Sequence, residues 1–216
     1  MRLKKKPLFI IGCILIVAGA LISIRSVSHS GSKTYFANSG KVFGTYYNIR
    51  YEAEADLEQA ILARLQAFDA SLSMFNDTSV ISRINRNEDA VTDTLFERMF
   101  AEAVEVSELS HGAFDITVAP LVHAWGFGKG KQPTAPIDEV AKRREIDSLL
   151  SFTGYDKITL RDHRLIKQDP RTQLDASAIA KGYGCDVVAD LLREQGCENF
   201  LVDIGGEVVA KGKNDK

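Results

Sequence analysis

The chain has 216 residues, of which 45% are apolar, and this length and composition suit one sizeable globular domain with its own core. The formal net charge of −2 hides an asymmetry, because the first 33 residues hold six basic residues and no acidic one, which leaves a net charge of −8 on the rest. An acidic body argues against a general nucleic-acid binder, since such proteins bind phosphates through basic surfaces.

The N-terminal part predicts a membrane segment. Residues 8–24 carry no charge, and eleven of these 17 residues are Leu, Ile, Val or Phe. At about −0.3 to −0.6 kcal/mol each, the eleven favour insertion by roughly 3–6 kcal/mol. Because basic residues precede the run, we expect a cytoplasmic N-terminus over 1–7, a single-pass transmembrane anchor over 8–26 in the inner (cytoplasmic) membrane, and an extracytoplasmic, periplasmic body. The alternatives are a cleaved signal ending near Ala20 and a lipid anchor at Cys13.

The remainder predicts one domain of mixed secondary structure. Residues 27–36 are typical of a linker, and the domain occupies 37–216. The predicted elements are, in chain order, strands over 35–51 with a break at Gly44, helices over 56–73 and from Ser79, a helix from Thr94 to Gly112, a helix over 137–152, a hairpin over 157–160 and 165–168, a helix from about Ser177, and a hairpin over 200–204 and 207–211. Helices mixed with antiparallel hairpins favour an α+β fold over a doubly wound sheet.

One of these helices has a recognisable start and an apolar face. Thr94-x-x-Glu97 matches a capping box, in which the first side chain accepts a hydrogen bond from the helix and the second reaches back. The face that we expect to be buried contains Phe96, Phe100, Ala103 and Leu109.

The segment over residues 174–186 is the most informative part of the chain. Ser177, Ala178 and Ala180 are small enough to let a ligand approach the backbone at the start of a helix, where N–H groups and a partial positive charge are available. Lys181 adds a full positive charge one turn later, which suits a phosphate or pyrophosphate. Asp175 offers an acceptor for the edge of a polar ring or for a metal. The alternative is a capped amphipathic helix with a solvated lysine.

A second segment, over residues 111–128, contains Ala113-Phe114-Asp115 and ends in Trp125-Gly126-Phe127-Gly128. Together with Asp175-x-x-Ala178-x-x-Lys181-Gly182-Tyr183, it resembles the ApbE family of FAD:protein FMN transferases. Further segments agree with this family in the same order over roughly residues 40–212: Phe43-Gly44-Thr45, Ser73-Met74-Phe75 followed by Ser79 and Asn85, and Asp203-Ile204-Gly205-Gly206-Glu207.

The resemblance implies an ApbE-like flavin transferase fold and a reaction. FAD would be the donor, FMN would pass to a Thr or Ser hydroxyl of a target protein, AMP would leave, and Mg²⁺ would assist. The resemblance also implies site residues: Phe43 and Phe75 stacking on aromatic rings, Ala113, Phe114 and Asp115 lining the FAD site, Asp175 accepting from a ring edge, Lys181 binding phosphate, and the Ala178 carbonyl binding the metal.

Several alternatives stay open at the level of the sequence. Asp115 could instead cap the following helix, the two phenylalanines could be core residues, and Asp203 and Glu207 could only shape their turn. Members of the family continue well beyond the matching hairpin, so the resemblance implies a C-terminally truncated member. The functional alternatives are an FAD-binding module without transferase activity, an FAD pyrophosphate hydrolase, and a structural membrane-anchored protein.

Overall fold

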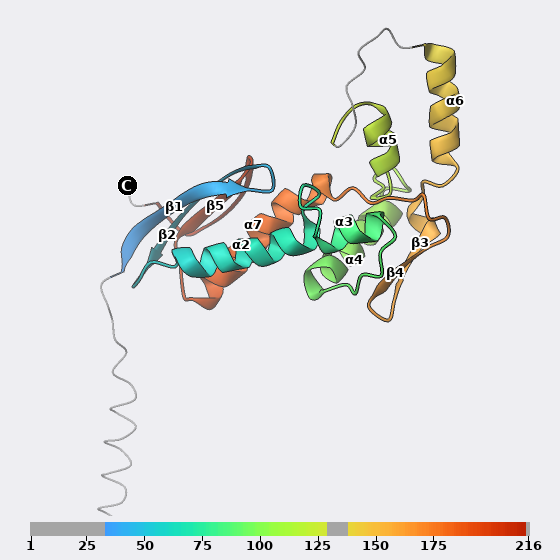
Figure 1. Cartoon of the computed structure of the whole chain (residues 1–216). Coiled ribbons are helices and arrows are strands. Elements are labelled where there is room, and N and C mark those ends of the chain that lie inside the picture. Colours follow the sequence, from blue (N-terminus) through green and yellow to red (C-terminus); the bar gives the residue numbers. More distant parts are fainter. Residues whose placement is uncertain (1–32, 129–137, 215–216) are drawn as a thin grey trace, which may run out of the picture.

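The computed structural model describes residues 33–128 and 138–214. Figure 1 shows a sheet at one end of the molecule, two long helices alongside it, and a second group of elements at the other end. The elements are, in chain order, β1 (Thr34–Val42), β2 (Thr45–Ala53), α2 (Glu58–Leu72), α3 (Val80–Asn85), α4 (Thr94–Leu109), α5 (Ala119–Ala124), α6 (Glu139–Leu150), β3 (Ile158–Arg161), β4 (Arg164–Lys167), α7 (Ser177–Glu194), β5 (Phe200–Ile204) and β6 (Glu207–Lys211).

The main sheet joins the first and last hairpins of the described chain. Its strand order is β1-β2-β5-β6, and every neighbouring pair is antiparallel. Tyr47, Ile49 and Tyr51 of β2 are buried and alternate with exposed residues, as expected for a sheet with one covered face. Because Tyr47 pairs with Ile204, the turn after β1 lies beside the turn after β5.

Helices α2 and α7 cover the inner face of this sheet and pack against each other (Figure 1). They also take part in a second cluster of buried side chains, formed with α3, α4 and β3. Phe68 of α2 packs edge-on against Tyr183 of α7 at a centroid distance of 5.3 Å. Helix α7 thus contributes to both clusters, and the residues at its start, Ile179 and Ala180, pack against the second one.

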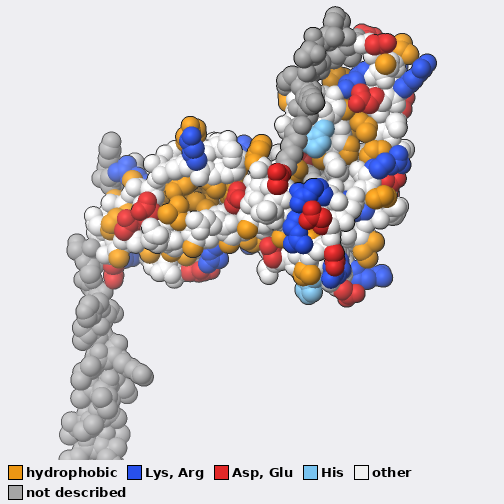
Figure 2. Space-filling view, in the orientation of Figure 1, with side chains coloured by type: hydrophobic (Ala, Val, Ile, Leu, Met, Phe, Trp, Pro, Cys, Tyr) orange, Lys and Arg blue, Asp and Glu red, His pale blue; other side chains and the backbone are white. Residues whose placement is uncertain are grey.

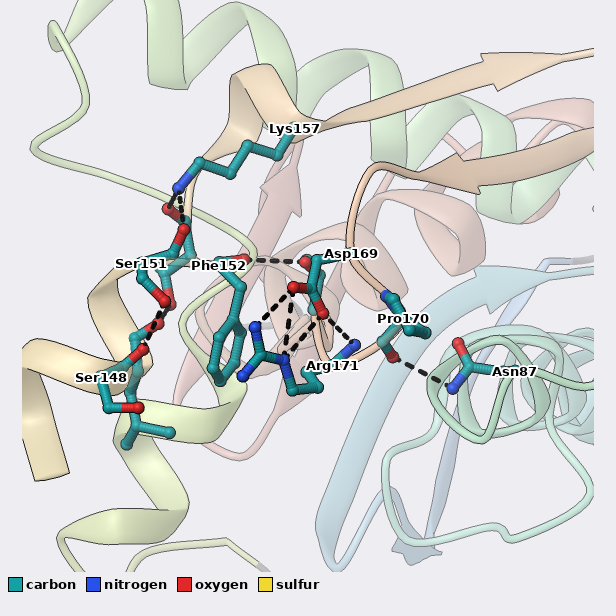
Figure 3. A network of polar contacts seen from close by, with 11 residues as sticks. Asn87, Ser148, Ser151, Phe152, Lys157, Asp169, Pro170 and Arg171 are labelled. Carbon is teal, nitrogen blue, oxygen red and sulfur yellow. Dashed lines mark hydrogen bonds and ion pairs between the residues drawn. The ribbon is translucent and has the colours of Figure 1, made fainter.

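The chain that leads from β4 into α7 is held by polar contacts, drawn in Figure 3. Asn87 donates a hydrogen bond to the Pro170 carbonyl at 3.0 Å. Arg171 pairs with Asp169 at 2.7 Å, holds the pKa of that carboxyl at about 2, and lies over the Phe152 ring. This connection is thus fixed before the chain reaches the residues at the start of α7.

Most predicted elements are confirmed, and a few details are wrong. The last three residues of the predicted linker belong to β1, which begins at Thr34, and residues 27–32 lie outside the described residues. The N-cap of α4 is Asp93, which accepts from Phe96, so Thr94 and Glu97 form no capping box. Leu109 is 74% exposed and does not belong to the buried face of α4. The helix predicted over 137–152 spans Glu139–Leu150, and residue 137 lies outside the described residues.

Helix α5 was not predicted, because its six residues are too few to show an apolar period. The expected transmembrane segment over 8–26 and the basic stretch over 1–7 lie outside the described residues. Among the residues that are described, none of the helices combines the length and the hydropathy that a membrane crossing needs.

Candidate functional site

The turn between β1 and β2 places an aromatic ring next to the start of α7. Phe43 and Gly44 both have positive φ, 51° and 73°, which a bulky side chain adopts at a cost of about 1–3 kcal/mol. Packing offsets that cost, because the Phe43 ring lies 4.9 Å from that of Phe68 and directly against Gly184. A larger residue than glycine at position 184 would push this ring away.

Two segments that are far apart in the sequence meet in front of α7. Val118 and Gln173 form a parallel bridge, and the Asp175 N–H donates to the Ile116 carbonyl at 2.7 Å. The Phe114 loop therefore lies beside the turn at Ala178, and both line the same cavity.

A side chain of α3 fixes the second of these segments. Asn85 donates to the Leu174 carbonyl and accepts from the Leu174 N–H, both at 2.8 Å. Asp175 follows directly, and its Oδ1 accepts from the Ser177 N–H at 2.8 Å. This bond satisfies one of the N–H groups that were expected to be unpaired at the start of α7.

Two cavities open at this place. The smaller, of about 230 Å³, has aromatic and aliphatic walls and includes Phe43, Phe75 and Lys181. The larger, of about 520 Å³, includes Ala113, Phe114, Asp115, Asp175 and Ala178, and also Phe75. Phe75 and Ser177 line both cavities, so the two adjoin, and every site residue predicted from the sequence lies on one wall or the other.

The walls contain further residues that the sequence analysis did not assign to the site. Phe68 and Leu72 come from the buried face of α2, and Ser73 and Met74 follow that helix. The larger cavity adds Val118, Val122, Phe127 and Gly128. The last two show that the loop after Trp125 borders the larger cavity. Ser73 and Met74 belong to a segment that carries the family resemblance. The remaining residues gave no separate signal, because an apolar residue at helical spacing is most often simply core.

Lys181 lies where the two hairpin turns of the main sheet come together. Its Nζ is 3.5 Å from the Gly205 carbonyl oxygen and 3.6 Å from Oε1 of Glu207. Gly205 has a φ of +60°, and a Cβ there would come within 2.9 Å of Thr45 and 3.1 Å of the Lys181 stem. Gly205 thus lies between Thr45 and the Lys181 side chain, and residues from three of the sequence motifs come together here.

Asp115 has a well-defined role in the loop. Its Oδ1 accepts from the N–H and the hydroxyl of Thr117, at 2.8 and 2.6 Å, and its Oδ2 accepts from the Tyr155 N–H at 2.9 Å. It does not cap α5, whose N-cap is Val118 and has no side-chain cap. Both carboxylate oxygens are therefore engaged within the protein, and so are the N–H groups of Ala113 and Phe114, which donate to Ser110.

The candidate metal position has oxygen donors. The Ala178 carbonyl belongs to the first turn of α7, and a carbonyl oxygen retains a second lone pair beyond its helical hydrogen bond. Asp175 lines the same cavity. Of its two carboxylate oxygens, only Oδ1 accepts a hydrogen bond from a described residue. Such donors fit a hard cation like Mg²⁺. The described part of the chain contains no cluster of three or more His, Cys, Asp or Glu residues suited to a metal.

Cys185 lies one turn beyond Lys181 but is no candidate nucleophile. Burial raises the pKa of its thiol to about 11, so it is protonated at neutral pH. Its Sγ donates instead to the Glu207 carbonyl at 3.1 Å and thereby ties β6 to α7.

An apolar and a more polar cavity adjoin beside a lysine and the start of a helix. This arrangement is complementary to an elongated ligand with aromatic ends and an anionic centre. The sequence pattern of the ApbE family matches residues 43–216, and the chain belongs to this family.

Individual relatives agree with this assignment. The FAD:protein FMN transferase of Vibrio cholerae is 38% identical over 185 residues, and that of Haemophilus influenzae is 36% identical over 192 residues. Each match covers 82% of this chain and 54% of the relative. The solved structure of the flavin transferase ApbE from Vibrio cholerae has a TM-score of 0.76 at 36% identity, over 84% of this chain and 60% of that chain.

Another solved structure, the apo form of the Pseudomonas stutzeri flavinyl transferase ApbE, has a TM-score of 0.73 at 29% identity. It covers 84% of this chain and 62% of that chain. The mixed fold with antiparallel hairpins is therefore that of known ApbE structures, and the chain spans about half the length of the curated relatives that it matches.

Proposed function

We propose that this chain binds FAD in the two adjoining cavities and takes part in transferring FMN to a target protein. The observation that carries the proposal is the convergence of all eight predicted residues on cavities that share Phe75 and Ser177. Relatives that match over most of this chain are named FAD:protein FMN transferases, which supports the same ligand.

Each residue has a role that follows from its chemistry. Phe43 and Phe75 stack on an aromatic ring, a contact worth about 0.5–1.5 kcal/mol beyond burial. Lys181 binds the pyrophosphate through a charge-assisted hydrogen bond, and the start of α7 adds its partial positive charge. Asp175 accepts from a ring edge or supports a metal. The Phe114 loop closes the opposite wall of the larger cavity.

A divalent cation is part of the proposal. The Ala178 carbonyl and the Asp175 carboxylate are the oxygens that would hold Mg²⁺. When bound, this ion would offset the negative charge of the pyrophosphate. The residues of the chain itself position the dinucleotide and contribute the Lys181 charge. Positioning and charge stabilisation are the main requirements in phosphoryl transfer.

The proposed reaction exchanges one phosphorus–oxygen bond for another. A Thr or Ser hydroxyl oxygen of the acceptor protein attacks the phosphorus of the FMN half and loses its proton as the new bond forms. The bond from that phosphorus to the bridging oxygen breaks, and AMP leaves with the electron pair. The products are a flavinylated protein and AMP.

The test is an assay of the 216-residue chain with FAD, Mg²⁺ and an acceptor protein. Covalent flavin on the acceptor supports the proposal, and we expect Lys181→Ala to weaken FAD binding about tenfold or more. Lys211→Ala is the matched control, because Lys211 is a residue of β6 that also pairs with a glutamate, Glu198, but lines neither cavity. If the chain retains no flavin, the proposal is wrong.

The same assay separates the alternatives. Release of AMP and FMN without labelling of the acceptor identifies an FAD pyrophosphate hydrolase, in which water replaces the hydroxyl. Binding of FAD without turnover identifies an FAD-binding module.

We further propose that residues 8–26 anchor the protein in the inner membrane with its body on the periplasmic side. The support is the uncharged apolar run behind a basic N-terminus. N-terminal sequencing of the protein extracted from membranes tests this, and a start at residue 21 would show a cleaved signal instead.

A further inference from the structure

Lys181 is held by a carboxylate that the proposed function leaves without a role. Its Nζ lies 3.6 Å from Oε1 of Glu207 and 3.5 Å from the Gly205 carbonyl oxygen. The same lysine lines the smaller cavity. The ammonium group therefore already has an anionic partner before any ligand is present.

The contact is built into the packing of β6 on α7. Lys181 and Cys185 are four residues apart on α7, so their side chains project from the same face of the helix. Cys185 fixes the Glu207 backbone through the hydrogen bond from its Sγ to the Glu207 carbonyl at 3.1 Å. With its backbone held at one turn of the helix, Glu207 reaches the lysine at the preceding turn.

Glu207 is not needed to shape the turn in which it lies. The carboxylate of Asp203 does this, because its Oδ1 accepts from the Gly206 N–H at 3.0 Å. Gly205 and Gly206 supply the two positive φ values that the turn requires. The expectation that Glu207 serves only the turn therefore leaves its side-chain contact unexplained.

We propose that Glu207 acts as a competitor for Lys181, so that the pyrophosphate of an incoming dinucleotide must displace this carboxylate. This inference rests on the proposed function, because it concerns the same FAD site. Glu207 is negatively charged, like the ligand, and pairs with the Lys181 ammonium group when no ligand is bound. It therefore lowers the affinity of the site for anions in general. A ligand with two phosphates and two ring systems is favoured, because its contacts together exceed the cost of breaking the Lys181–Glu207 pair.

The expected effect is modest, because the pair is partly solvated. The side chains of Lys181 and Glu207 are 39% and 53% exposed, and exposed ion pairs shift an equilibrium by no more than about fivefold. Removing the charge with Glu207→Gln should tighten FAD binding by about twofold to fivefold at low salt. The gain should shrink as salt screens the pair.

The test is a double-mutant cycle on the full chain, with FAD affinity measured by quenching of flavin fluorescence. The variants are Glu207→Gln, Lys181→Ala and the two combined. Glu198→Gln is the matched control, since Glu198 also pairs with a lysine of β6, Lys211, at 2.9 Å but lines neither cavity. This control should leave FAD affinity unchanged.

The proposal predicts tighter binding in Glu207→Gln and no tightening when Lys181 is already alanine. Unchanged or weaker binding in Glu207→Gln, or tightening that persists without Lys181, would overturn the competitor role while leaving the proposed function intact. Failure of the unaltered chain to bind FAD would overturn the proposed function and this inference together.

Discussion

Replacing Asn85 with alanine should loosen the FAD site and destabilise the protein at the same time. The substitution removes both hydrogen bonds to Leu174, and Leu174 has no exposed surface. Two such bonds contribute about 1–3 kcal/mol, and the abandoned N–H and carbonyl groups carry a further desolvation cost. Because a cavity borders Asn85 and can admit water, we expect a loss of about 2 kcal/mol.

For a domain of this size, that loss lowers the melting temperature by about 4–8 °C. Circular dichroism of the ligand-free chain measures this melting temperature. A titration with FAD measures the loss of affinity, which we expect because Leu174 directly precedes Asp175, a residue that lines the larger cavity. The melting temperature of Asn85→Asp should fall between those of the wild type and Asn85→Ala, since this variant keeps the acceptor for the Leu174 N–H but loses the donor.

Asn87→Gly is the control. It removes an exposed hydrogen bond to Pro170, while glycine tolerates the φ of 59° at this position. A melting temperature for Asn85→Ala that matches that of the control would refute the reasoning on stability. A destabilised Asn85→Ala variant with unaltered FAD affinity would refute the link between this contact and the site.

Three further predictions concern single contacts. Phe75→Ala should weaken FAD binding by about twofold to twelvefold through the lost stacking, with little change in melting temperature because Phe75 is 64% exposed. Gly205→Ala should lower both stability and FAD affinity, because the new Cβ meets Thr45 and the Lys181 stem. His163 hydrogen-bonds Glu97 at 2.7 Å, which raises the pKa of His163 above 6.5, while hydrogen bonds from Thr92 and then from His163 lower the pKa of Glu97 below 4.5. The stability that His163 adds should therefore be largest between pH 4.5 and 6.5 and should fall as pH rises through its folded pKa.

Each of these has a matched comparison. Leu109→Ala removes another exposed apolar side chain, which lies outside both cavities, and should not change FAD affinity. Gly206→Ala imposes a similar backbone strain, at a φ of +91°, without any neighbour within 4 Å. If it weakens FAD binding as much as Gly205→Ala, the contact with Lys181 is irrelevant. A difference in melting temperature between wild type and His163→Asn that does not vary with pH would contradict the charge-pair account.

The sequence was sufficient for elements whose signals are local. Gly205-Gly206 between two apolar runs predicted the last hairpin to the residue, and the helix predicted over 56–73 is close to the bounds of α2. Asp93 was overlooked as the cap of α4 because Thr94-x-x-Glu97 matches a capping box equally well, and Glu97 turns instead to Thr92 and His163. That choice depends on a hairpin distant in the sequence.

The candidate site shows the same difference between local and long-range features. The motif residues around Asp175 and Lys181 were recognisable from their types and spacing. Their relation to the sheet was not, because the contact between Lys181 and Glu207 depends on α7 packing against the hairpin of β5 and β6. That hairpin in turn joins the sheet by pairing with β2. Asn85 likewise has its partner 89 residues away. Long-range pairing of this kind leaves no periodic signal in a single sequence.

Figure 2 shows basic and acidic side chains beside each other on the visible face of the molecule. Because that face has no broad positive surface, we expect recognition of an anionic ligand to depend on the local arrangement at the start of α7.

A crystal structure of the 216-residue chain with FAD would test that arrangement most directly. We predict pyrophosphate oxygens within hydrogen-bonding distance of Lys181 Nζ, ring systems on both sides of Phe75, and Glu207 no longer in contact with the ammonium. A flavin bound elsewhere, with Lys181 still beside Glu207 and both cavities empty, would contradict the account.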